Sequence, residues 1–542
     1  MMQYLSRNAR RENDMRQKRI PWRRLTAAVL TAGLWFLLCG FTKAATYVGN
    51  EWPVNFWNSE MNTLQEDFEK IREDGFNAVV IVVPWRQFQP DLSSRRKNQS
   101  AYESLSRILD AAEANGLRVV LRAGYTWDCY DPSGNVTVRY RKLRSDESTR
   151  KAWLEYLSQL YGAVKDHPAF GDAFLTWEDF WNYMDECASF GTGNMDIPKR
   201  SGYSDWVFEN YSAEEISTHY GAEITEPGEL WFPSLTSPAR KFVLEWNDAW
   251  MNQLLGDSQE VFPGISMEVR LDIDPVSGTE GVRVGVPHTV TFPAGSADFT
   301  SCMYAPTMGY QQGQRLGAEE AVGMARGILG QLRACAGWKP VFIDQFLFTD
   351  NTPGFEMNAR IRDEELPAYI TGMAPVIESM EYGYAVWTYR DYADNIVVNG
   401  EFGRNEEDWK FSNGALAVEK EGNRKLFLPA DSRAVQEFYS RRTATETGDI
   451  LSFDYNVLRP CRLRISAGHY VKDLNLEGSG SFREEMHTFG EHQLAFSCLD
   501  GEVEIDNVKV YSHVTEGGLY QIDGTEGPCL GAVRTLNSWL PD

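Results

Sequence analysis

The chain has 542 residues, which is too long for one ordinary domain and predicts two or three folded units. Its hydrophobic share of 43% and charged share of 24% are those of a globular protein. The formal net charge of −24 argues against nucleic acids and anionic lipid surfaces as partners, because both repel an acidic protein. The eight cysteines form neither a CxxC pair nor a Cys/His cluster, so a structural zinc site is not expected.

The N-terminal segment has the features of an export signal. Arginines crowd the first residues, an apolar run follows from Leu25 to Phe41, and small residues come next. This order predicts a secretory signal peptide with cleavage after Ala44. Because the apolar run is near the shortest length that spans a bilayer, an uncleaved membrane anchor is the alternative. We assign residues 1–45 to this segment and expect a secreted or cell-surface protein.

Residues 46–392 alternate short apolar runs with amphipathic helical stretches. The run Phe76–Trp85 is rich in β-branched residues and follows a helix-like segment, as expected for a buried strand. Further strands are expected at 117–122, 264–271, 299–304, 340–346 and 383–387. Continuous apolar strands separated by helices indicate a parallel sheet covered by helices. About eight such units predict an α/β fold, the (β/α)8 TIM barrel.

The stretch from Phe174 to Trp181 is the strongest functional signal, because an apolar run leads into two carboxylates flanked by tryptophans. Glu178 is expected where a buried strand emerges from the core, beside Trp177. Such surroundings raise the pKa of a carboxyl group, as a general acid acting on a glycosidic oxygen requires, and tryptophan also stacks on sugar rings. An ordinary strand end with solvated acids is the alternative reading. Asp179 should face elsewhere on the strand.

In a TIM barrel the chemistry collects at the carboxyl ends of the strands. Polar and aromatic residues of this chain fall at those expected ends: Trp85, Arg86, Arg122, Trp127, Asp128, Glu268, Arg270, Tyr304, Asp344, Gln345, Trp387 and Asp391. The arginines could bind substrate or hold carboxylates ionised, although ion pairs that compensate burial explain them equally well. Trp387 is well placed as a sugar platform, whereas Tyr304 is as readily a core residue.

The sequence pattern changes after Tyr392. Short alternating runs broken by Gly, Asn and Pro, without a helix-length periodic segment, predict an antiparallel β-sandwich (jelly roll) at 393–515. In an exported protein Cys461 and Cys498 of this domain are a conceivable disulfide pair. Residues 516–542 carry Gly-rich turns and are assigned to a C-terminal tail that the pattern does not place.

The barrel resembles the clan A glycoside hydrolases, on individually loose motifs that cover most of residues 47–392: 83–86, 117–124, 167–178, Tyr304, 339–343 and 386–387. The C-terminal region resembles jelly-roll carbohydrate-binding modules, through 399–402, Trp409 and the closing strand 503–508. The first resemblance implies an acid/base glutamate after barrel strand four, matched by Glu178, and a nucleophile after strand seven. No cofactor is expected, and the second resemblance allows a structural calcium ion in the sandwich.

Two positions depart from the pattern that this resemblance implies. Trp177 stands where the family has asparagine, and Gln345 occupies the nucleophile position, where an amide cannot form a glycosyl-enzyme ester. Asp344 should point to the opposite face of its strand unless a bulge re-aims it. As the second carboxylate we rank Asp344 ahead of Glu268, which could simply pair with an arginine across the barrel top. The short side chain of Asp344 would widen the carboxyl spacing and favour inversion.

The sequence thus predicts an exported hydrolase of O-glycosidic bonds in a polysaccharide or oligosaccharide, with Glu178, Asp344 and Glu268 as catalytic candidates. The substrate-binding candidates are Trp85, Arg86, Arg122, Trp127, Trp177, Tyr304, Gln345 and Trp387. The alternative is a glycan-binding barrel silenced by Gln345, with a scaffold or exopolysaccharide-handling role. Neither hypothesis needs a metal or cofactor, and a membrane is expected as partner only through an uncleaved N-terminal segment.

Overall fold

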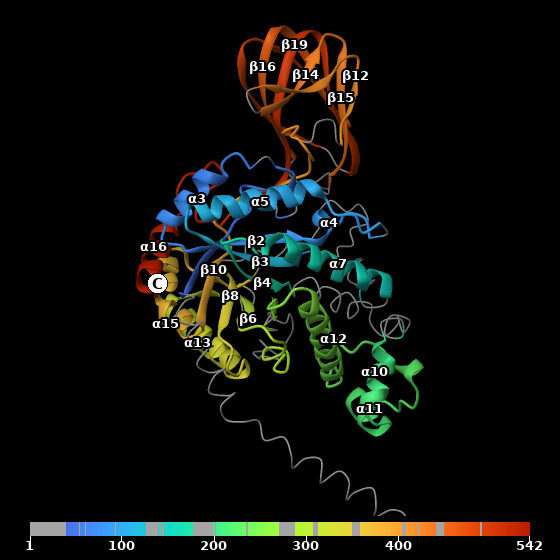
Figure 1. Cartoon of the computed structure of the whole chain (residues 1–542), viewed down its shortest axis with the longest axis vertical. Coiled ribbons are helices and arrows are strands. Elements are labelled where there is room, and N and C mark those ends of the chain that lie inside the picture. The colour runs from blue at the N-terminus through green and yellow to red at the C-terminus, as the bar shows by residue number, and fades with distance from the viewer. Residues whose placement is uncertain are drawn as a thin grey trace, which may run out of the picture.

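The computed structural model describes residues 40–541 except 52, 54, 60, 93, 126–138, 140–142, 144–145, 177–198, 200–201, 235–236, 270, 272–287, 307–309, 311–312, 349–357, 404–407, 421–422, 441–448 and 488–489. Eight parallel strands form its larger unit (Figure 1). They are β1 (Thr42–Thr46), β2 (Ala78–Pro84), β3 (Arg118–Tyr125), β4 (Phe170–Leu175), β5 (Ser266–Met267), β6 (Thr300–Tyr304), β8 (Val341–Phe346) and β10 (Glu381–Val386). Their order is β5-β4-β3-β2-β1-β10-β8-β6, and a parallel bridge between Glu268 and Ser301 joins the two ends. The predicted TIM barrel is confirmed.

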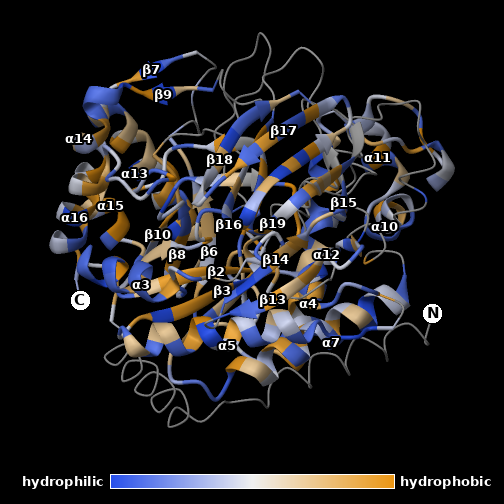
Figure 2. Ribbon diagram, turned by 90° about the horizontal axis from the view of Figure 1, so that it is seen from above, coloured by the Kyte–Doolittle hydropathy of each residue, from blue (hydrophilic) through white to orange (hydrophobic). Residues whose placement is uncertain are grey.

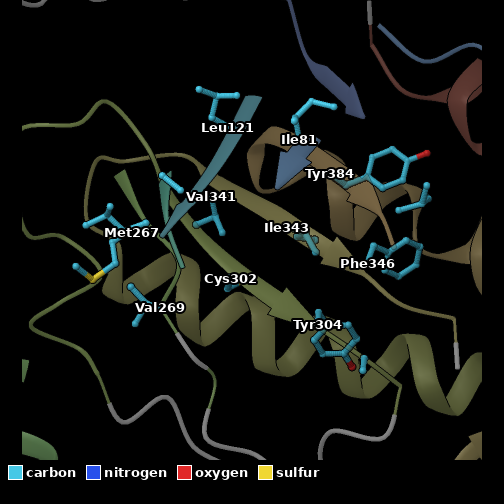
Figure 3. Close-up of a cluster of buried hydrophobic side chains, with 14 of the residues drawn as sticks. Ile81, Leu121, Met267, Val269, Cys302, Tyr304, Val341, Ile343, Phe346 and Tyr384 are labelled. Carbon is cyan, nitrogen blue, oxygen red and sulfur yellow. The ribbon is translucent and has the colours of Figure 1, made fainter. Parts of the chain in front are cut away.

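Helices cover the outside of the barrel (Figure 1). They are α3 (Leu64–Glu73), α4 (Trp85–Phe88), α5 (Gln99–Ala114), α7 (Glu147–Val164), α12 (Arg240–Val261), α13 (Ala318–Cys335), α14 (Leu366–Gly372) and α15 (Ala374–Glu378). Two short helices, α10 (Tyr203–Asn210) and α11 (Ala213–Tyr220), lie away from the strands, and α10 packs on α12. Alternate strand residues such as Ile81, Leu121 and Ile343 form the main hydrophobic core with these helices (Figure 3). A separate pair of short strands, β7 (Arg315–Leu316) and β9 (Arg360–Ile361), forms a two-stranded sheet.

The first barrel strand corrects the expected N-terminal boundary. Strand β1 spans Thr42–Thr46, is buried along its whole length, and pairs with both β10 and β2. The cleavage expected after Ala44 would cut this strand and leave only Ala45 paired with β10. The boundary at residue 45 is therefore wrong, because the barrel begins no later than Thr42. The prediction failed because the small buried residues Ala44 and Ala45 of this strand resemble the small residues of a signal cleavage site.

The second unit is a sandwich-like antiparallel β-domain, as the sequence predicts. Its strands are β11 (Tyr392–Asn395), β12 (Lys410–Ser412), β13 (Leu416–Lys420), β14 (Asn423–Pro429), β15 (Ser432–Ser440), β16 (Asp449–Ala467), β17 (Tyr470–Leu476), β18 (Ser479–Met486) and β19 (Gly490–Thr515). Hydrophilic and hydrophobic residues alternate along them (Figure 2). Trp409 is buried beside Phe402 and Phe496, so it is a core residue.

The C-terminal segment returns to the barrel instead of forming the expected tail. Helix α16 (Leu530–Trp539) packs on α14, and its apolar residues belong to the barrel core. Asp74, which follows α3, accepts hydrogen bonds from Arg534 Nε at 2.8 Å and Tyr520 Oη at 3.1 Å. Asn537 accepts from Tyr384 of β10 at 2.7 Å. Helix α16 lies against β1 and β10, so it takes the place of the helix that follows the eighth barrel strand, β10. The sandwich is therefore an insertion between β10 and α16.

Candidate active site

The barrel interior changes from apolar to polar toward the carboxyl ends of the strands. Inward-facing residues near the other end form a small hydrophobic cluster: Ala44, Ala78, Val80, Val120, Phe174, Phe299, Phe342 and Ala385. Two residues further along their strands, Val120 is followed by Arg122, Phe174 by Thr176, and Phe299 by Ser301. This is the period of a β-strand, so these polar side chains form the next interior layer.

Arg122 and Glu268 form a buried ion pair in this layer. Arg122 Nη2 lies 2.9 Å from Glu268 Oε2, and the two side chains are only 1% and 2% exposed. Arg122 also donates to Thr176 Oγ1 at 3.1 Å, and its guanidinium lies 5.9 Å from the ring centre of Trp387. The hypothesis that Glu268 pairs with an arginine across the barrel is confirmed. A buried ion pair of this kind is costly to break, because either charge left alone stays out of water.

A bulge in β8 turns two consecutive residues, Asp344 and Gln345, toward the interior. Along β6, Cys302 pairs with Ile343 but the next residue, Met303, pairs with Gln345, so Asp344 is the extra residue. The register also shifts here on the β10 side. With its amide oriented toward the guanidinium, Gln345 Oε1 accepts from Arg122 Nη1 at 3.0 Å and Nη2 at 3.1 Å. The bulge required for Asp344 to reach the site is therefore present.

Asp344 is fully buried beside Glu268, Arg122 and Ser301. Burial raises its pKa well above the usual value, the negative charge of Glu268 raises it further, and Arg122 offsets part of this effect. Neither carboxyl oxygen makes a hydrogen bond of good geometry with a described donor. Burial and the neighbouring Glu268 carboxyl therefore favour the protonated form of Asp344.

The remaining predicted residues divide into three groups. Trp85 and Tyr304 are fully buried on the outer side of the sheet, where Trp85 packs on Trp153 and the ring of Tyr304 belongs to the hydrophobic core (Figure 3). Their assignment to substrate binding is wrong, because each is at a strand end but faces the helices. Arg86 is exposed on α4, and Trp387 is half-buried above Arg122. Trp127, Trp177 and Glu178 lie outside the described residues, as do Asp128 and Arg270.

Two polar members of the interior layer were missed by sequence reasoning. Thr176 and Ser301 contact Arg122 and Asp344 respectively. The signal was available, because each stands two residues after an inward-facing phenylalanine. Asp391, by contrast, accepts a hydrogen bond from the Gly518 backbone at 2.8 Å and so anchors the returning C-terminal segment.

The described residues contain no group of three or more His, Cys, Asp or Glu side chains arranged to hold a metal ion. The calcium ion allowed in the sandwich therefore finds no such carboxylate cluster in the described part of the chain, and the absence of a cofactor stays a prediction. Among the residues described, no helix is both long and apolar enough to span a membrane.

Comparisons with known proteins give structural matches only. No protein-family model matches the chain, and no curated protein is similar to it. Among solved structures, the exo-β-1,4-mannosidase Op5Man5 from Opitutaceae bacterium strain TAV5 is 16% identical, with 65% of this chain and 53% of that chain covered and a TM-score of 0.40. The GH5_18 structure from Streptomyces cattleya with GlcNAc is 15% identical (65% and 72% covered, TM-score 0.39). The β-glycosidase BGL167 is also 15% identical (65% and 87% covered, TM-score 0.38).

The chain spans about half the length of the mannosidase. The strand order of this chain establishes the barrel fold independently of these likenesses.

Proposed function

We propose that this protein is an exported O-glycosyl hydrolase that acts on a polysaccharide or oligosaccharide. The observation that carries the proposal is the buried Arg122, Glu268 and Asp344 cluster inside the carboxyl end of the barrel. Thr176, directly after β4, accepts a hydrogen bond from Arg122 of this cluster, and Glu178 follows two residues later in the sequence. Catalytic residues of TIM-barrel enzymes come from the ends of several strands at this face.

The proposal gives each carboxyl group a separate role. Glu178 protonates the leaving oxygen as the general acid. Glu268 acts as the ionised nucleophile or base, and its negative charge is held by Arg122. Asp344 keeps a proton and hydrogen-bonds Glu268, which reverses the ranking expected from the sequence, since a protonated carboxyl is neither nucleophile nor base. Trp387 offers the aromatic face on which a sugar ring stacks.

Export remains part of this proposal. The apolar run from Leu25 to Phe41 supports a signal peptide or an anchor. Because β1 is needed for barrel closure, we place any cleavage before Thr42, or the segment stays as an N-terminal anchor. N-terminal sequencing of the protein recovered from its native source distinguishes these: a mature N-terminus beyond Thr42 would contradict the proposal.

The test uses Glu178→Gln with Asp179→Asn as the matched control. Hydrolysis is measured on nitrophenyl glycosides of different sugars and on soluble polysaccharides. Loss of a general acid should slow cleavage of natural glycosides about 10²–10⁴-fold. The loss should be much smaller for dinitrophenyl glycosides, whose leaving groups need little protonation. Equal losses for both leaving groups, or equal losses in both variants, would refute the role of Glu178.

Gln345 favours a second candidate function, a barrel that binds glycans without hydrolysing them. Its amide is hydrogen-bonded to Arg122 in the cluster, and it cannot form a glycosyl ester. In that case the wild-type protein retains oligosaccharides on an affinity gel but releases no reducing ends from any of the substrates above. Detectable hydrolysis that is lost in Glu178→Gln excludes this alternative.

A further inference from the structure

A cavity of about 480 Å³ lies between the barrel and the sandwich, outside the barrel interior. Its barrel wall comes from described residues between Tyr47 and Thr63, which follow β1, together with Arg390, which follows β10. Its other wall is the outer face of the sandwich strands β16, β18 and β19. Ligand sites occur preferentially at domain interfaces, in cavities of roughly 300–1,000 Å³. The cavity therefore has both the position and the size of a binding site.

The sandwich wall carries a carboxylate whose orientation is set by its neighbours. Asp454 on β16 accepts hydrogen bonds from Asn507 Nδ2 at 2.7 Å and from Ser481 Oγ at 2.5 Å. Ser452 and Arg483 pair across β16 and β18 and also line the cavity. Hydroxyl, amide, carboxylate and guanidinium groups are thus collected on one face. This combination of donors and acceptors suits a ligand that presents several hydroxyl groups.

The charges nearest the domain junction are neutralised in pairs. Lys509 Nζ lies 2.6 Å from Glu51 Oε1, and both side chains are largely buried. Arg390 Nη2 lies 2.5 Å from Asp67 Oδ1, and Asp67 also accepts from Tyr47 Oη at 2.8 Å. These ion pairs link elements distant in sequence and hold the walls in place. Arg483, Glu401 and Asp454 also line the cavity, so charges of both signs are mixed on its walls and the lining does not select a ligand of one charge.

Aromatic side chains complete the lining. Phe56 comes from the barrel side, and Phe482 and Tyr511 come from the sandwich. A neighbouring cavity of about 10 Å³, which shares Glu51 and Lys509, has room for about one water molecule. The main cavity is far larger than that, so one structural water does not account for it. Polar groups next to apolar rings match the two kinds of surface of a sugar.

We propose that this junction cavity is a second binding site, which takes a neutral saccharide. The class of ligand rests on the proposed function of the barrel, whereas the existence of the site rests on the cavity alone. The outer face of β16 and β18 would read the hydroxyl groups, and Asp454 is the central acceptor. A bound chain would hold the barrel and the sandwich together across the junction.

The experiment measures binding of the full chain to an array of neutral, uronic-acid and sulfated oligosaccharides. Asp454→Ala removes the acceptor, and Ser481→Trp fills the cavity from an exposed strand position. Asp473→Ala is the matched control, because Asp473 lies on β17, pairs with Arg464 and is not part of the lining. Thermal unfolding confirms that the variants are folded. We expect neutral oligosaccharides to bind, and binding to fall at least tenfold in the first two variants only.

Absence of saccharide binding, preference for acidic glycans, or equal binding by all variants would each overturn the proposal. Hydrolysis of a small aryl glycoside, which fills only the barrel, separates the two proposals. If hydrolysis persists while no variant-sensitive binding is found, the junction site alone is refuted. If binding depends on Asp454 but no substrate is hydrolysed, the junction site stands and the hydrolase proposal fails.

Discussion

Replacing Arg122 by methionine tests the buried cluster most directly. The change leaves the Glu268 carboxylate buried at 2% exposure without the guanidinium 2.9 Å away. Breaking one side of such a pair costs about 3–5 kcal/mol, because the remaining charge is not returned to water. The side-chain oxygens of Thr176 and Gln345 also lose the hydrogen bonds that Arg122 donates to them. Each buried acceptor left unpaired costs about 1–3 kcal/mol. We therefore expect the free energy of unfolding to fall by at least 3 kcal/mol.

The assay is urea-induced unfolding followed by intrinsic fluorescence, with Arg362→Met as control. Arg362 pairs with Glu365 at 2.8 Å, but the two side chains are 42% and 34% exposed, so its loss should cost only about 0–1 kcal/mol. The double variant Arg122→Met/Glu268→Met should recover most of the stability, since apolar residues of similar volume replace a buried pair at little cost. The reasoning is refuted if Arg122→Met costs no more than the control, or if the double variant is less stable than Arg122→Met.

Three further predictions concern pH, the C-terminal segment and the cysteines. The pKa of Asp344 is raised in the folded protein, whereas an unfolded aspartate has a pKa of about 3.9. Above about pH 4 the unfolded chain therefore loses this proton while the folded protein keeps it. The free energy of unfolding consequently falls as the pH rises above about 4. Asp344→Asn should remove this loss, so its stability advantage over wild type should grow from pH 4 to pH 8; a constant difference in urea unfolding would contradict the assignment. Truncation after residue 515 removes α16 from the barrel core and should abolish cooperative unfolding of the barrel, as seen by circular dichroism; an unchanged transition would show that α16 is dispensable. Cys461 and Cys498 are buried free thiols on adjacent strands, and burial raises the pKa of Cys498 to about 12, so glutathione disulfide should oxidise them only slowly in the folded protein. Refolding with glutathione disulfide should join them and stabilise the sandwich by about 3–4 kcal/mol. Thiol titration that still finds both free after refolding would exclude the bond.

The barrel and the sandwich could be predicted because each has a local signature. Apolar β-branched runs such as that in β2 recur with helices between them, and the sandwich strands alternate with a period of two. Strand β1 was missed because its sequence, Thr-Lys-Ala-Ala-Thr, lacks β-branched apolar residues and follows an apolar run. Its strand conformation depends on pairing with β10, more than 330 positions later. No local pattern contains that information.

The candidate site divides in the same way. From the sequence by itself, an acidic chain with barrel strands, a sandwich and the residues Arg122, Glu268, Asp344 and Gln345 at strand ends could be determined. Only the tertiary structure decided which of these side chains share the interior, because inward and outward directions change wherever a register shifts. The one-residue bulge in β8 brings Asp344 and Gln345 to the same face, and barrel closure at Glu268 and Ser301 places Glu268 beside them. Bulges and closure arise from hydrogen bonds between distant strands, so they follow from the assembled sheet.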